Sequence, residues 1–120
     1  MKLLTSLCIF ALLAMSALAA DPIRHVVSLK FKKDADPAKV RKVEEEFAAL
    51  KGKIPAIASL EWGTNISPEK HDKGFTHCWI VDFKSAQDRD AYLVHPDHEA
   101  FAKGLGGLIE DVFVLDFVPR

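Results

Sequence analysis

The segment YLVHPDHEAF, residues 92–101, holds a tyrosine and two histidines close together. Histidine titrates near neutral pH and often serves as a general acid or base. A neighbouring tyrosine hydroxyl can donate a hydrogen bond to an oxyanion formed during such a reaction. The segment also fits an ordinary break between two helices, because Pro96 disfavours helical geometry in the residue before it. It therefore indicates an acid/base site, a helix boundary, or both.

His98 is the histidine in this segment whose predicted position suits a general base. It would be the third residue of a helix starting at Pro96, where the positive end of the helix dipole favours neutral imidazole. Asp97 and Glu99 act in the opposite direction, and a pKa near 6.5 leaves the outcome to small shifts. The alternative is a structural role in which His98 caps or packs the helix, with Tyr92 as a core aromatic.

A metal site is a second interpretation of the histidines, because imidazoles bind zinc and copper. Against it, Pro96 interrupts the His95-x-x-His98 spacing, and no acidic or cysteine ligand obviously completes the set. We therefore expect a pocket without a metal. The histidines considered as possible metal ligands are His25, His77, His95 and His98.

The first 19 residues have the pattern of a secretory signal peptide. A short basic start, an apolar stretch and the small residues Ala17 and Ala19 follow one another. We expect cleavage after Ala19, export to the periplasm or the medium, no membrane attachment afterwards, and one mature domain over residues 20–120. Cys8 would leave with the signal, so Cys78 could form no internal disulfide.

Composition favours a soluble domain and argues against nucleic acid as a partner. The chain is 49% hydrophobic and 28% charged, and 16 Lys and Arg residues oppose 17 Asp and Glu residues. No long basic block is present, whereas nucleic-acid binding proteins concentrate positive charge on one face.

Hydrophobic periodicity and capping residues predict four strands and three helices. Asp36 before Pro37 is typical of a helix start, and Ser85 with Asp88 is typical of a capping box. The predicted strands cover residues 23–31, 57–65, 75–84 and 112–118, and the helices cover about 37–52, 86–95 and 96–104.

This order predicts an α+β protein with a ferredoxin-like βαββαβ fold and a four-stranded antiparallel sheet. In this fold the first and third strands are central neighbours. We expect this one pair to run parallel, with right-handed crossover connections. His25 and His77 are each the third residue of their strand. They are therefore expected side by side at one end of the sheet.

Alternation along the strands assigns residues to the two faces of the sheet. One face is apolar enough to be covered by helices. The other face is too apolar to be left exposed to water, yet it carries too many polar residues to form the core of a monomer. We therefore expect a homodimer with two sheets face to face in a barrel, and with Cys78 at the interface. The face assigned to the helices holds Val27, Leu29, Phe31, Trp79, Val81, Phe83, Leu115 and Phe117; the opposite face holds Val26, Thr76, Cys78, Ile80, Val112 and Val114, interrupted by Ser28, Lys30, Asp82 and Asp116.

The strand IRHVVSLKFK, the WGTN segment and above all YLVHPDH resemble the stress-responsive α/β barrel domain family of the dimeric α+β barrel superfamily. The resemblance covers essentially the whole mature chain. Some plant members are polyketide cyclases that close a poly-β-ketone by aldol condensation without a cofactor. By resemblance, His98 is the general base, Tyr92 assists it, and His25 and His77 lie in the same cavity. The resemblance also implies that the pocket uses no organic cofactor.

The expected wall of this cavity consists of Val27, Trp79 and Phe47. Where the cyclases carry aromatic residues on the first helix, this chain has Val43, Glu44 and Phe47, and Glu44 argues against a long apolar substrate.

Three functions are compatible with such a pocket. The first is an enzyme that abstracts a proton next to a carbonyl, with His98 as base and Tyr92 stabilising the enolate or alkoxide. The second is a non-catalytic dimer that binds a small ligand or protects against stress. The third is a cofactor-free oxygenase or a haem-handling protein.

Overall fold

The computed structural model of the chain describes residues 20–120, so the predicted signal peptide, residues 1–19, lies outside the described residues. The order of the elements confirms the ferredoxin-like βαββαβ prediction, with the second helical region divided in two. The elements are β1 (Ile23–Phe31), α1 (Pro37–Lys53), β2 (Ser59–Thr64), β3 (His77–Phe83), α2 (Ala86–Leu93), α3 (Pro96–Gly104) and β4 (Ile109–Phe117).

Local capping sets the start of each helix. The Asp36 carboxylate accepts a hydrogen bond from the Ala38 N–H at 2.9 Å, and the Ser85 hydroxyl accepts one from the Asp88 N–H at 3.1 Å. At α3 the His95 Nδ1 accepts from the Asp97 N–H at 3.1 Å. Each contact satisfies a backbone donor that the helix itself leaves free. The YLVHPDHEAF segment is therefore indeed a break between two helices.

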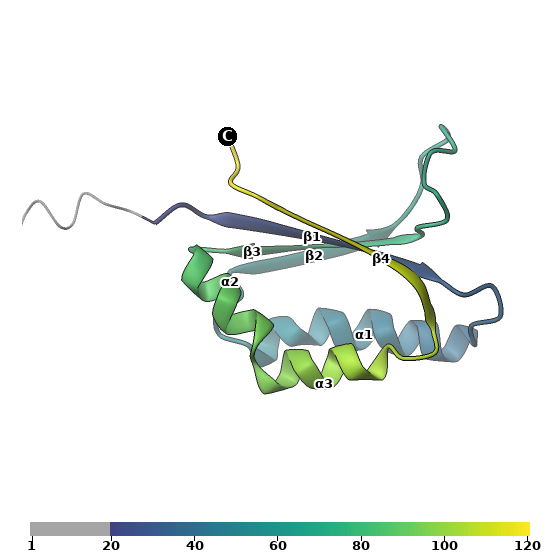
Figure 1. The fold of residues 1–120 in the computed structure, drawn as a ribbon, viewed down its shortest axis with the longest axis horizontal. Coiled ribbons are helices and arrows are strands. Elements are labelled where there is room, and N and C mark those ends of the chain that lie inside the picture. Colours follow the sequence, from purple (N-terminus) through teal and green to yellow (C-terminus); the bar gives the residue numbers. More distant parts are fainter. Residues whose placement is uncertain (1–19) are drawn as a thin grey trace, which may run out of the picture.

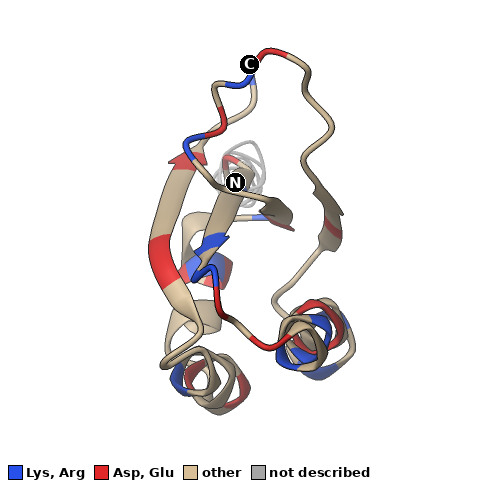
Figure 2. Ribbon diagram, turned by 90° about the vertical axis from the view of Figure 1, so that its right-hand side faces the viewer, with Lys and Arg blue, Asp and Glu red and all other residues tan. Residues whose placement is uncertain are grey.

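The sheet has the order β2-β3-β1-β4, and all three neighbouring pairs are antiparallel. The three helices lie on one side of it and leave the other side open (Figure 1). Seen at right angles, the strands form a curved layer above the helices, and the helices carry charges of both signs (Figure 2). We call the two sides of the sheet the helix face and the open face.

The expected parallel pairing of β1 with β3 is wrong. β2 and β3 are joined as a hairpin, so β3 runs antiparallel to β2. β3 is also antiparallel to its other neighbour, β1. His25 consequently pairs with Val81, and His77 pairs with Leu29. The two histidines lie on the same face but four residues apart along the strand, a separation of roughly 13 Å. They stand at opposite ends of the sheet rather than side by side.

The face assignment is also reversed for β4. Leu115 pairs with Val26, and Asp116 pairs with His25. Residues directly opposite each other in neighbouring strands point to the same face. Because VFVLDFV is apolar in both alternating sets, its pattern does not determine which set faces the helices. The open face receives Phe113, Leu115 and Phe117, and the helix face receives Val112, Val114 and Asp116.

The core fills the space between the helix face and α1 and α3. Trp79 is fully buried, and its ring stacks on Phe47 with centroids 4.7 Å apart and planes 8° apart. Phe101 from α3 packs against the same Phe47 ring at 4.8 Å. Val27 is buried in this cluster as well. The three residues predicted to line a cavity, Val27, Phe47 and Trp79, are thus packed against one another or their neighbours as core.

Within residues 20–120, no helix is both long enough and apolar enough to cross a membrane.

Candidate active site

Three of the four residues predicted to share a site come together. The His25 and Tyr92 ring centroids are 5.8 Å apart, and those of Tyr92 and His98 are 4.4 Å apart. We call this group the His25–Tyr92–His98 cluster. His77 does not join it, because β3 carries His77 to the other end of the sheet.

The break between α2 and α3 positions the two helical members of the cluster. Tyr92 is at the end of α2 and is buried, whereas His98 is in the first turn of α3 and is half-buried. His98 Nδ1 lies 3.1 Å from the Leu93 carbonyl oxygen. A carbonyl oxygen only accepts hydrogen bonds, so Nδ1 carries the proton in this contact. In the neutral ring the lone pair is then on Nε2, which is free to act as a base.

The surroundings favour the neutral form of His98. Burial lowers the pKa of His98 below its usual 6.5, and the neighbouring His25 lowers it further. The hydrogen bond to Leu93 opposes this effect without reversing it. At pH 7 most molecules therefore hold His98 as a neutral imidazole, the form required of a general base.

Tyr92 has the complementary property. Burial raises the pKa of the Tyr92 hydroxyl well above its usual value of 10. The hydroxyl remains protonated throughout the neutral range and can donate a hydrogen bond. A protonated donor beside a neutral base is the arrangement needed to move a proton and stabilise the resulting oxyanion.

His25 is held by residues that sequence reasoning did not include in the site. Its Nδ1 lies 2.5 Å from Asp116 Oδ1, and Asp116 Oδ2 accepts a hydrogen bond from Arg89 Nη1 at 3.0 Å. This contact, with the neighbouring Asp90, raises the pKa of Arg89. The signal for Asp116 was its place as a lone charge in an apolar strand, but it had been assigned to the open face. The Asp116–Arg89 pair fixes the orientation of the His25 ring.

The His77 end of the sheet has a different environment. His77 Nδ1 is 2.7 Å from the Thr76 hydroxyl, and Nε2 is 3.7 Å from Glu44 Oε1, too far for a hydrogen bond. His77 Nε2 and Trp79 Nε1 are the buried side-chain polar atoms that have no hydrogen-bond partner among the described residues. Such an unpaired buried group costs about 1–3 kcal/mol.

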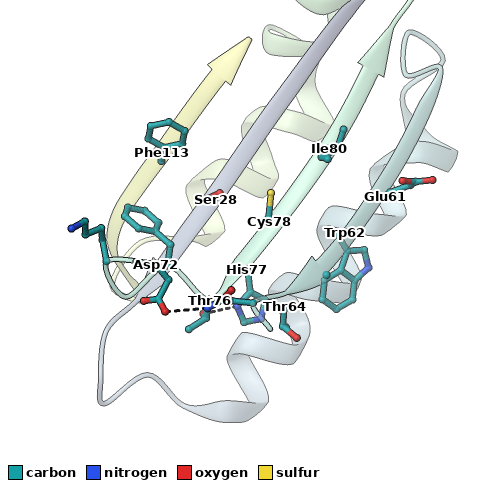
Figure 3. Close-up of a pocket in the computed structure, with 14 residues that line it drawn as sticks. Ser28, Glu61, Trp62, Thr64, Asp72, Thr76, His77, Cys78, Ile80 and Phe113 are labelled. Atoms are coloured by element: carbon teal, nitrogen blue, oxygen red, sulfur yellow. Dashed lines mark hydrogen bonds between the residues drawn. The ribbon is translucent and has the colours of Figure 1, made fainter. Parts of the chain in front are cut away.

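Two of the hollows in the described structure include His77 in their lining. The larger, about 600 Å³, lies on the open face and beside the edge strand β2. Figure 3 shows Ser28, Cys78, Ile80 and Phe113 along its floor, with Trp62 and His77 at one end. The smaller, about 350 Å³, lies between β1 and the start of α1. Neither hollow is lined by Tyr92 or His98.

Over residues 20–120, no group of three or more His, Cys, Asp or Glu side chains is arranged to hold a metal ion. Cys78, the cysteine in this range, is free and partly buried on the open face.

Comparisons with known proteins agree with this fold. The chain is 31% identical over 101 residues to stress-response A/B barrel domain-containing protein HS1 of Arabidopsis thaliana, covering 84% of this chain and 93% of the relative. It is 28% identical over 98 residues to olivetolic acid cyclase of Cannabis sativa, covering 82% and 97%. The structure of a hydroxynitrile lyase from Passiflora edulis superposes with a TM-score of 0.78 at 24% identity, covering 83% and 94%.

Other solved structures of this fold are described as dimeric ferredoxin-like proteins. The model of the stress responsive A/B barrel domain matches residues 23–119. The chain therefore belongs to the stress responsive A/B barrel domain family.

Proposed function

We propose that the protein is an enzyme that abstracts a proton from carbon next to a carbonyl group in a small molecule, without a cofactor. The observation that carries this proposal is the contact between neutral His98 and protonated Tyr92. The similarity to a protein named as a cyclase supports the same class of chemistry.

In this mechanism His98 Nε2 takes the proton from the carbon atom. The electron pair of that C–H bond moves to the carbonyl oxygen, where the Tyr92 hydroxyl donates a hydrogen bond to the developing enolate. The enolate carbon can then attack a second carbonyl group, and protonated His98 returns its proton to the new alkoxide. His25, which is held by Asp116 and lies with its ring 5.8 Å from the Tyr92 ring, positions the substrate.

Proton abstraction is best tested as hydrogen–deuterium exchange, because this readout does not require the natural substrate. The protein would be incubated in D₂O with acetophenone, phenylacetone or an aliphatic β-keto ester, and exchange at the α-carbon followed by NMR. Because the fold lowers the pKa of His98, we expect the catalysed rate to rise with pH, with a midpoint below 6.5, and to level off above it. A rate that follows only hydroxide concentration would contradict the proposal.

A non-catalytic ligand-binding or stress-protective role is the second candidate. It is favoured by one observation, namely that neither hollow reaches Tyr92 or His98. Absence of catalysed exchange with every compound of the panel, together with saturable binding of any of them, would support this role instead.

We further propose that two chains associate through their open faces. Phe113, Leu115 and Phe117 are 50%, 51% and 42% exposed there, which is unusual for a large apolar group on a stable monomer. We expect sedimentation equilibrium at micromolar concentration to give the mass of a dimer. Leu115→Asp should give the mass of a monomer, whereas Val94→Asp, at an exposed position on the helix side, should not change it. A wild-type monomer would contradict the proposal.

A further inference from the structure

We propose that the smaller hollow, between β1 and the start of α1, is a second ligand site, separate from the His25–Tyr92–His98 cluster, and that it binds a small hydroxy acid. Its polar centre is the Glu44–His77 pair, and its rim carries Arg41 and Lys32. This inference is independent of the proposed enzymatic function, because it concerns the opposite end of the sheet.

The first observation is a buried donor without a partner. His77 is 9% exposed, and its Nδ1 is engaged by the Thr76 hydroxyl. When that hydroxyl donates to Nδ1, the neutral ring carries its proton on Nε2. The Glu44 carboxylate is 3.7 Å from Nε2, so this N–H has an acceptor nearby but no hydrogen bond. Buried donors of this kind are rare unless another molecule completes them.

The second observation is that both groups border a hollow. Glu44 and His77 are part of the lining of this 350 Å³ space. The Glu44 side chain is 20% exposed, so it is more accessible from the opening than the His77 imidazole, which is 9% exposed. Phe31, Pro37 and Val40 supply apolar walls. The hollow thus combines a polar inner end with apolar sides, as small-molecule sites commonly do.

The chemistry of the inner end selects a hydroxyl group. A hydroxyl oxygen can accept from His77 Nε2–H while its own hydrogen is donated to the Glu44 carboxylate. A ligand carboxylate in that place would have no proton to donate and would be repelled by Glu44. The geometry therefore assigns a hydroxyl to the inner end.

The rim selects a negative charge at the other end of the ligand. Arg41 and Lys32 both line the hollow and are exposed, and Glu44 is the acid in the lining. A carboxylate directed toward Arg41 could accept a bidentate, charge-assisted hydrogen bond. A hydroxyl inside, a short apolar body and a carboxylate outside together describe a small hydroxy acid.

The experiment is a titration of the ¹⁵N-labelled protein, followed by NMR, with three matched probes. 4-Hydroxybenzoate carries both groups, benzoate lacks the hydroxyl, and 4-hydroxybenzamide lacks the charge. We expect 4-hydroxybenzoate to bind most tightly and to shift amide signals around Glu44 and His77. Equal affinity for benzoate, or no binding of any probe, would overturn the proposal.

Variants then locate the site. Glu44→Ala should weaken binding of 4-hydroxybenzoate about tenfold or more, while Glu45→Ala, an exposed neighbour on the same helix, should leave it unchanged. Arg41→Ala should weaken 4-hydroxybenzoate but not 4-hydroxybenzamide, with Lys39→Ala as the matched control.

His98→Ala separates the two ends of the sheet. It should leave binding of 4-hydroxybenzoate intact whether or not the protein is an enzyme. If binding were lost in His98→Ala and retained in Glu44→Ala, the probe would bind at the His25–Tyr92–His98 cluster. That result would refute the proposed site at Glu44 and His77.

Discussion

Replacing Trp79 by alanine is expected to lower the free energy of unfolding by about 3–5 kcal/mol. Trp79 is completely buried and stacks on Phe47, so its removal leaves a large void between the sheet and α1. The neighbours that would have to close this void are themselves tightly packed, which limits relaxation. Denaturation with urea at a fixed protein concentration measures the effect, since association of chains would otherwise change the apparent stability.

Trp62→Ala is the matched control for this prediction. Trp62 pairs with Trp79 across the β2–β3 ladder but is 41% exposed, so it loses much less buried surface. Trp79→Phe should fall between the two, because it keeps a stacked ring and also removes an unpartnered buried N–H. If Trp79→Ala and Trp62→Ala destabilised the protein equally, the interior packing described above would be incorrect.

The second large effect is expected from His98→Ala, which should lower the rate of catalysed α-proton exchange about 10²–10⁴-fold. The variant removes the Nε2 lone pair that accepts the proton. Because His98 lies at the edge of the cluster and is half-buried, the fold should survive, as circular dichroism would verify. His71→Ala removes an exposed loop histidine and should leave the rate unchanged. Equal rates for wild type and His98→Ala would eliminate His98 as the base.

Local chemistry is what the sequence predicted well. Asp36 and Ser85 cap helix starts as predicted, and each start depends on a contact within three residues. The break at Pro96 follows from the geometry of a single residue type. That break joins Tyr92 and His98, and it was mainly the family resemblance that implied a shared site for them.

Features that depend on distant pairing were not predicted correctly. The direction of β3 follows from its hairpin with β2, and treating it as parallel to β1 placed His77 beside His25. The phase of β4 is set by its register with β1, which an evenly apolar strand does not reveal. The Asp116–His25 contact joins residues far apart in the chain and depended on that register.

The antiparallel pairing also determines at which end of the sheet a tag or fusion partner is attached. β1 begins opposite the end of β3, and β4 ends opposite Arg24, so residues 23 and 117 both lie at the His25 end of the sheet. In Figure 1 the described chain enters and leaves on the side of α2, away from the loop between β2 and β3. A tag or fusion partner joined directly to residue 20 or to residue 120 would be attached at the end of the sheet that holds the His25–Tyr92–His98 cluster. An immobilised form of the protein would therefore present the His77 end to solution and turn the cluster toward the support.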